Sequence, residues 1–142
     1  MTRPLRSVLA RTLLGPMVLC FQLFAIYVLI HGHLSPGGGF QAGVLLGAGA
    51  ILAGLVAGRR AIPRPRAALL SVIAGLALYG GLGAAAPLLG RPYLDYGALP
   101  GTGDESRRRY LGILGIEVGV TLAVAGAVIL LFHALSTEPE RP

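Results

Sequence analysis

The sequence predicts an all-α integral membrane protein with four transmembrane helices that pack through stripes of glycine and alanine. Of its 142 residues, 54% are hydrophobic and only 13% are charged, whereas soluble domains carry roughly a quarter charged residues. Four apolar segments can each cross a hydrocarbon core of about 30 Å, which takes roughly 20 helical residues. They are approximately residues 13–30, 40–58, 67–89 and 111–133. Helices are expected because hydrocarbon offers no partner for unpaired backbone groups, and the alternating pattern of a barrel strand is lacking.

The first apolar segment follows Arg3, Arg6 and Arg11, an order that also occurs in signal peptides. Its apolar run is too long for the core of a signal peptide, and no small-residue cleavage site follows it, so we expect a permanent helix. Gln22 is its one strongly polar interior side chain. We expect Gln22 either to hydrogen-bond to a neighbouring helix or to take part directly in a transport path.

A polar stretch, HGHLSPGGGFQ, separates the first two segments at residues 31–41. His31 and His33 suggest metal binding, but residues two apart point to different faces of a helix, and His133 lies at the far end of the last segment. We therefore expect no metal site and no cofactor. A polar, capping or proton-handling role suits the two histidines better, since imidazole titrates near neutral pH.

The rest of this stretch is typical of a tight, non-helical turn. Ser35 can cap a helix, Pro36 fixes its own dihedral angle, and glycines allow backbone angles that other residues avoid. A phosphate-binding loop is not expected, because the preceding strand and the required spacing are both missing. Either a short polar connection or a functional re-entrant turn fits residues Ser35, Pro36, Gly37, Gly38 and Gly39.

The second segment carries a stripe of small residues at spacings of four, four, three, four and four, which places them on one helix face. Such a stripe allows another helix to approach closely, and van der Waals contact drives helix association in lipid. Its members are Gly39, Gly43, Gly47, Ala50, Gly54 and Gly58. The third segment has a glycine-rich second half, including Gly80 and Gly81, that predicts a bent or unwound helix.

The fourth segment combines a small-residue stripe with Glu117, the one acidic residue within the four predicted spans. At about 100° per residue, Glu117 points roughly 160° away from the centre of that stripe. We therefore expect the stripe to pack within the subunit, and Glu117, with Thr121 one turn later, to meet a partner subunit or a hydrated cavity. A carboxylate in hydrocarbon is expensive and usually pairs with a cation or relays protons. The stripe consists of Gly112, Gly115, Gly119, Ala123 and Gly126.

The charges predict the topology. All twelve basic residues are arginines, and eight of them lie in the two termini and the second connection, against four in the third connection. By the positive-inside rule, both termini are expected in the cytoplasm and residues 31–41 outside. The histidines of that stretch would then lie near the depth of Glu117, which is six residues, or about 9 Å, from the start of the fourth predicted segment on the same side of the membrane. The clustering of arginines at helix ends indicates lipid headgroup contacts, and nucleic-acid binding is not expected.

Residues 31–43 resemble a family signature, Gly-His-x-Ser-Pro-Gly-Gly-Gly-Phe. In this chain the resemblance includes Ser35 to Phe40 and extends to Gln41 and Gly43. It is the signature of the MnhB family, the small MnhB/MrpB subunits of the multisubunit Mrp-type sodium/proton antiporter. The similarity extends over nearly the whole chain, as a single four-helix domain at residues 1–142, and includes the element Glu117-Val118-Gly119-Val120. Ala42 departs from the pattern, where the family often has glycine, which predicts slightly looser packing.

The resemblance implies a small subunit of a hetero-oligomeric complex in a prokaryotic cell membrane that exchanges cytoplasmic sodium for external protons. Similar sequences also occur in ion-pumping membrane-bound hydrogenases, so an equivalent subunit of such a complex is the alternative. One acidic residue in four spans is too few for an autonomous antiporter, and no catalytic arrangement of an enzyme is present.

We therefore expect a non-catalytic subunit needed for assembly, with a possible share in the ion path. The candidate ion-path residues are Glu117, His31, His33, Thr121 and Gln22. A purely structural scaffold is the rival, and a small metalloenzyme using the histidines is a third hypothesis. The expected partners are the other subunits of the complex, membrane lipids, sodium ions and protons.

Overall fold

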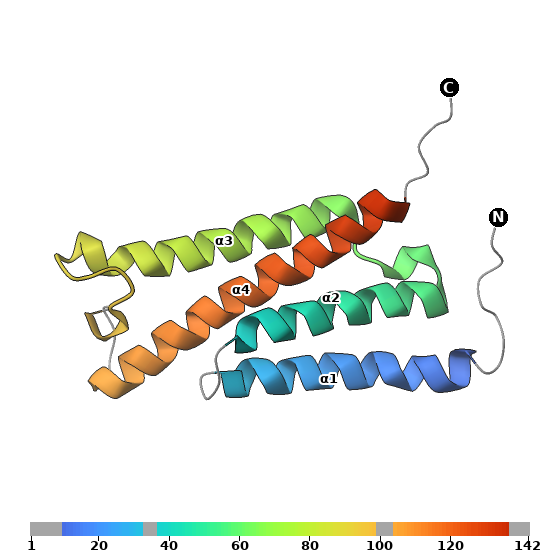
Figure 1. The fold of residues 1–142 in the computed structure, drawn as a ribbon, viewed down its shortest axis with the longest axis horizontal. Helices are drawn as coiled ribbons and strands as arrows, with labels where there is room; N and C mark the ends of the chain where they lie inside the picture. The colour runs from blue at the N-terminus through green and yellow to red at the C-terminus, as the bar shows by residue number, and fades with distance from the viewer. Residues whose placement is uncertain (1–9, 33–36, 99–103, 137–142) are drawn as a thin grey trace, which may run out of the picture.

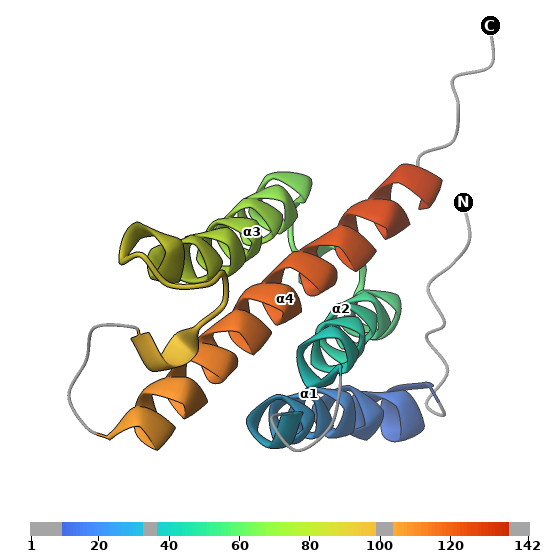
Figure 2. The same cartoon turned by 60° about the vertical axis from the view of Figure 1, so that its left-hand side comes forward.

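The computed structural model describes residues 10–32, 37–98 and 104–136, and within them it contains four long helices. They are α1 (Gly15–His31), α2 (Gly38–Ala57), α3 (Pro65–Leu88) and α4 (Glu105–Ser136). Helix α4 lies between α2 and α3, and α1 packs on α2 (Figures 1 and 2). The helices thus form a row in the order α1, α2, α4, α3. The connection from α2 to α3 lies at the same end as the start of α1 and the end of α4 (Figure 1).

Helices α1 and α2 are joined by a sharp reversal that depends on glycine. Gly37 has φ +94°, in the left-handed region that side chains with a Cβ rarely adopt. Its carbonyl then accepts a hydrogen bond from the Gln41 N–H at 3.0 Å, which closes the first turn of α2. The geometry at Gly37 is consistent with the predicted tight turn. His33, Ser35 and Pro36, for which the turn was also predicted, lie outside the described residues.

The end of α2 corrects one predicted packing residue. Gly58 has φ +105°, its N–H donates to the Gly54 carbonyl at 2.9 Å, and an added Cβ there would meet nothing within 4 Å. Gly58 therefore terminates the helix instead of extending its packing stripe. A short 3-10 turn (Arg59–Ala61) follows, and Pro65 begins α3 at a position where its missing N–H is not needed.

Helix α3 is continuous from Pro65 to Leu88, so of the two predicted alternatives, a bent or an unwound second half, the unwound one was wrong. Gly80 and Gly81 stay helical, and an added Cβ at either would meet nothing within 4 Å. The intrinsic cost of glycine in a helix, about 1 kcal/mol per residue, is small beside the backbone hydrogen bonds that an unwound segment in lipid would lose.

The connection from α3 to α4 is held by two tyrosines that pack on glycines. The ring of Tyr93 lies against Gly83, and an added Cβ at Gly112 would come within 2.7 Å of the Tyr96 Cβ. Burial raises the pKa of the Tyr96 phenol above its usual value, and the neighbouring Tyr79 and Tyr93 add to that effect. Gly112 was expected to pack on another helix but instead packs on this connecting segment.

Helix α4 begins at Glu105, six residues earlier than hydropathy alone predicts. Asp104 starts it, because its carboxylate accepts a hydrogen bond from the Arg107 N–H at 3.1 Å. Arg109 bonds to Glu105 at 2.6 Å and lies 3.9 Å from Asp95. The arginine run that interrupts the apolar pattern is thus part of the helix, with acidic partners close by.

Small residues form the helix contacts. Among the described residues, the buried hydrophobic positions are mostly alanines, and Ala42 is fully buried in spite of the looser packing expected there. An added Cβ at Gly119 would lie 2.9 Å from the Gly75 carbonyl oxygen, so α3 and α4 touch backbone to backbone. Gly115 and Gly126 also face α3, Gly115 against the Leu82 side chain and Gly126 against the backbone and side chain of Val72.

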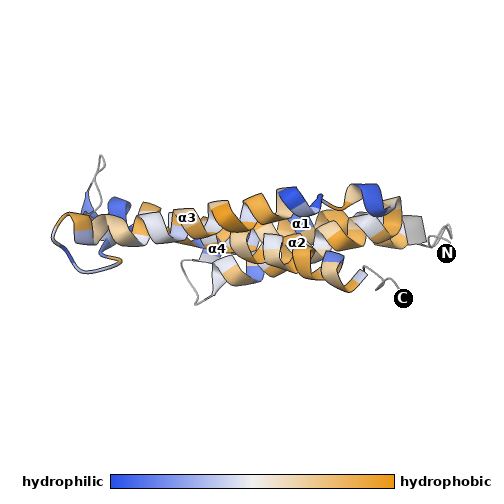
Figure 3. Cartoon of the chain, turned by 90° about the horizontal axis from the view of Figure 1, so that it is seen from above, coloured by the Kyte–Doolittle hydropathy of each residue, from blue (hydrophilic) through white to orange (hydrophobic). Residues whose placement is uncertain are grey.

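The large apolar side chains point outward, as expected of a protein that is solvated by lipid. Leu19 and Leu23 of α1 and Leu70 of α3 are about two thirds exposed, at 66%, 69% and 65%. Hydrophobic residues cover the helix lengths, and hydrophilic ones gather at the connections (Figure 3). All four helices are long and apolar enough to span a membrane. The predicted fold class is confirmed.

Candidate functional site

Glu117 lies where α1 ends and α2 begins. An added Cβ at Gly32, just after the end of α1, would lie 2.8 Å from the Glu117 Cδ, and one at Gly38 would lie 3.3 Å from its Oε1. The residue is half-buried and its Oε2 atom is buried. Two glycines from the α1–α2 reversal therefore leave the space that this carboxylate occupies.

The depth of Glu117 differs from the prediction. It lies twelve residues after Glu105, about 18 Å along α4 instead of the predicted 9 Å, because the helix begins earlier. It is still level with the α1–α2 reversal, since it contacts Gly32 and Gly38. The expectation that the carboxylate and the polar stretch share one depth therefore holds for the described part of that stretch.

The backbone of α4 is fixed to α2 beside the carboxylate. An added Cβ at Gly39 would lie 2.6 Å from the Glu117 carbonyl oxygen. The hydroxyl of Thr121, which is only 2% exposed, lies 3.0 Å from the Gly39 carbonyl and 2.7 Å from that of Glu117, and donates its proton between them. Thr121 thus joins the two helices one turn from Glu117.

The same contact continues along α2. An added Cβ at Gly43 would lie 2.7 Å from the Val124 Cβ, and one at Gly47 would lie 2.9 Å from the Val128 Cβ. The glycine stripe of α2 therefore packs on the Glu117 face of α4. The prediction for this face was wrong in one respect: α2 of the same chain covers it, where a partner subunit or a hydrated cavity was expected.

The electrostatic setting suits a titratable or cation-binding group. The first N–H groups of α2 carry partial positive charge, which favours an anionic carboxylate nearby. The C-terminal carbonyls of α1, which ends at the same place, carry partial negative charge and favour a cation or a proton. A carboxylate between two helix ends of opposite polarity can exchange a proton or attract a cation with little rearrangement of the backbone.

The comparison with protein families identifies the chain's relatives. Residues 9–130 match the family model described as a domain related to the MnhB subunit of the Na+/H+ antiporter. The chain belongs to the MnhB family. Neither the comparison with curated proteins nor that with solved structures returned a match. The resemblance inferred from the signature is therefore confirmed.

MnhB membership associates the chain with Na+/H+ antiport and ion transport. It indicates a membrane subunit of a multisubunit antiporter, and so a part of a transporter with other subunits as partners. The matched residues include all of α1, α2 and α3 and most of α4, so the Glu117 site lies wholly within the family domain.

The described histidines of this MnhB-family chain do not surround Glu117. His31 is exposed; its Nδ1–H donates to the Tyr27 carbonyl at 3.0 Å, and its ring stacks on Tyr27 at 4.3 Å. His133 lies by the α2–α3 connection, where its Nε2–H donates to the Pro63 carbonyl at 3.0 Å. In residues 10–32, 37–98 and 104–136, no group of three or more metal-ligating side chains is present.

Gln22 of α1 faces α2, as expected for a residue at a helix interface. An added Cβ at Gly49 would lie 2.6 Å from the Gln22 Nε2 atom. Gly49 lies outside the stripe predicted from the sequence, and helical periodicity places it on one face of α2 with the buried Gly38 and Ala42. On this second small face, Gly49 packs on α1 and Gly38 on Gly32, the residue after α1. The spacing of four and seven from Gly38 to Gly49 is the signal that could have revealed it.

Two further signature residues in the described part of the chain lie on its outside. Phe40 is 57% exposed and Gln41 is also exposed, on the first turn of α2. Gly32 was missed as a site residue because nothing in the sequence pairs it with Glu117. Gly54 faces the α2–α3 connection, since the Ile62 side chain fills the space beside it. Ala50 packs against the small apolar cluster of Ile62, Ala68 and Ile129.

Proposed function

We propose that this chain is a non-catalytic membrane subunit of a sodium/proton antiporter complex and that Glu117 borders the path of the transported cation or proton. The observation that carries the proposal is the position of the Glu117 carboxylate beside Gly32 and Gly38, between the end of α1 and the start of α2. Carboxylates at membrane depth are rare and usually serve ion or proton transfer.

The charge distribution supports a cytoplasmic location of both termini, and the resemblance to the antiporter subunits supports a prokaryotic cell membrane. Arg59, Arg60, Arg64 and Arg66 lie at the α2–α3 end of the fold, where α1 begins. The sequence has eight arginines in the two termini and the α2–α3 connection and four near the α3–α4 connection, and the positive-inside rule assigns the side with more basic residues to the cytoplasm.

A structural scaffold is the second candidate, because the packing of Gly43 and Gly47 on α4 suits a subunit that holds neighbours in place. An equivalent subunit of a hydrogenase-type complex would use the same fold. The scaffold and the hydrogenase-type subunit both keep the four-helix architecture. The scaffold differs from the proposed antiporter subunit because it assigns the Glu117 carboxylate no part in transport.

Glu117→Gln separates the candidates, and Gly43→Leu tests the packing that all of them require, in a complex that is purified through a tag on another subunit. Glu117→Gln keeps the size of the side chain, so we expect the complex to assemble with sodium-driven proton transport lost. Gly43→Leu forces a large side chain against Val124, so we expect the complex to fail to assemble. Assembly with normal transport in Glu117→Gln would instead favour the scaffold.

A further inference from the structure

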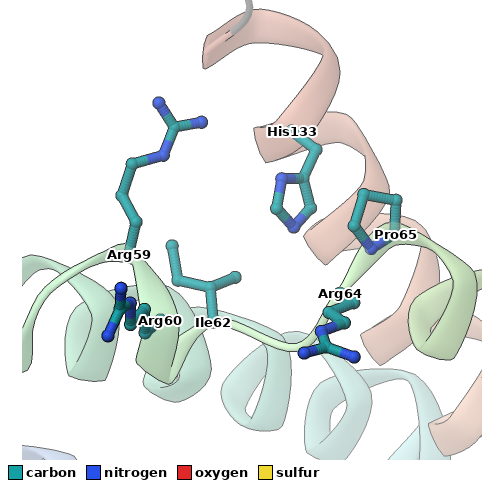
Figure 4. Close-up of a pocket in the computed structure, with 6 residues that line it drawn as sticks. All are labelled: Arg59, Arg60, Ile62, Arg64, Pro65 and His133. Atoms are coloured by element: carbon teal, nitrogen blue, oxygen red, sulfur yellow. The ribbon is translucent and has the colours of Figure 1, made fainter.

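An open hollow of about 610 Å³ lies at the end of the fold where α2 connects to α3. It is lined by Arg59, Arg60, Ile62, Arg64, Pro65 and His133, and none of these is acidic. Figure 4 shows Arg59 and His133 on its two sides, with Ile62 between them. The volume is within the range of about 300–1,000 Å³ that is common for ligand pockets.

The backbone holds this hollow in a defined shape. Gly58, at φ +105°, ends α2 and starts the short turn that carries Arg59 and Arg60. The hydrogen bond from His133 to the Pro63 carbonyl attaches the end of α4 to the connection. Ile62, which also lines the hollow, is only 5% exposed and packs inward. The cationic side chains therefore project from a segment that is fixed at both sides.

The lining predicts an anionic ligand with phosphate chemistry. Guanidinium groups present paired N–H donors that match the oxygens of a phosphate. Helix α3 begins beside the hollow at Pro65, and the N-terminus of a helix adds partial positive charge. Three arginines and a helix start thus favour an anionic ligand over a neutral one, and a phosphate offers the guanidinium groups more oxygen acceptors than a carboxylate does.

We propose that this hollow binds the phosphate of an anionic glycerophospholipid headgroup. A lipid is favoured over free phosphate because the hollow lies at the end of two membrane-spanning helices. Leu55 and Leu69, each four residues along the chain from a residue that lines the hollow, are 50% and 49% exposed, which gives acyl chains apolar surface on the adjoining turns of α2 and α3. The proposal does not depend on any role of Glu117, which lies near the opposite end of α2.

The test uses the full chain purified in a mild detergent and measures lipid binding by native mass spectrometry. Phosphatidylglycerol and phosphatidylcholine are titrated in parallel against the wild type and two charge-matched variants. Arg59→Gln with Arg64→Gln removes two arginines of the hollow. Arg91→Gln with Arg107→Gln removes two exposed arginines at the other end of the fold. Circular dichroism checks that both variants keep the helical content of the wild type.

We expect phosphatidylglycerol to bind more tightly than phosphatidylcholine and the hollow variant to weaken it by roughly tenfold or more, with the control unchanged. Equal weakening by both variants would overturn the proposal, because a diffuse charge effect would then explain binding. Full competition by millimolar inorganic phosphate would overturn the lipid assignment.

Discussion

The carboxylate of Glu117 lies directly against Gly32, the residue that follows α1, so that an added Cβ at Gly32 would come within 2.8 Å of the Glu117 Cδ. This contact joins the one carboxylate of the predicted spans to the signature segment of the MnhB family. The sequence predicted a shared depth for the polar stretch and Glu117, but it did not predict the direct contact between these two residues.

The Gly32 contact gives the first prediction. Gly32→Ala should displace the Glu117 carboxylate, because the end of a flexible side chain can move while the backbone stays in place. We expect an assembled complex with reduced sodium/proton exchange, measured as proton flux in inverted vesicles. Gly80→Ala is the control, since its Cβ would meet nothing within 4 Å. Wild-type exchange in Gly32→Ala would show that the position of the carboxylate is irrelevant.

The close approach of α3 and α4 gives a second prediction. Gly75→Ala should destabilise the chain by about 1–3 kcal/mol, because its Cβ would meet backbone atoms of Gly119 and Ala123 that cannot move aside. Gly81→Ala, in the same helix, should be neutral or slightly stabilising, since that position is open and alanine favours a helix. Thermal unfolding in detergent measures both, and equal effects would contradict the packing.

The hydroxyl of Thr121 gives a third prediction. Thr121→Val keeps the shape but removes the hydrogen bond shared with the Gly39 and Glu117 carbonyls, so we expect a loss of about 1 kcal/mol in stability. Thr121→Ser should restore most of it, because the hydroxyl returns. A valine variant as stable as the wild type would mean that these carbonyls need no donor.

The fold was largely predictable from the sequence because hydropathy and glycine spacing depend on local order. The stripe from Gly39 to Gly47 and the face of Gly119 and Gly126 were found by helical periodicity alone. The start of α4 was missed because Asp104 determines it through a cap, while the arginines that follow hide it from hydropathy. The continuity of α3 was missed because propensity was weighed without the backbone hydrogen bonds that lipid makes necessary.

The site was predictable only in part. Glu117 and Thr121 stand out by residue type, but their partners Gly32 and Gly38 are set by the way in which α1, α2 and α4 meet. The predicted orientation of Glu117 away from the α4 glycines was correct, yet that face packs on α2. Which helix covers a face depends on the order of packing, and this order is not contained in the periodicity of a single segment.

The topology gives a fourth prediction. With the native Cys20 replaced by alanine, Arg60→Cys should react with an impermeant thiol reagent only from the cytoplasmic side, and Arg107→Cys only from outside. Both positions are exposed and lie at opposite ends of the fold. Labelling of residue 60 from outside would reverse the orientation, and labelling of both from one side would contradict four spans.

The most direct measurement is sodium-driven proton flux per assembled complex in Glu117→Gln, with the amount of complex determined in the same vesicles. If the carboxylate borders the ion path, the flux should fall at least tenfold while assembly equals that of the wild type, and Glu117→Asp should retain part of it. A Glu117→Gln complex that assembles normally and transports at the wild-type rate would contradict the proposed role of Glu117.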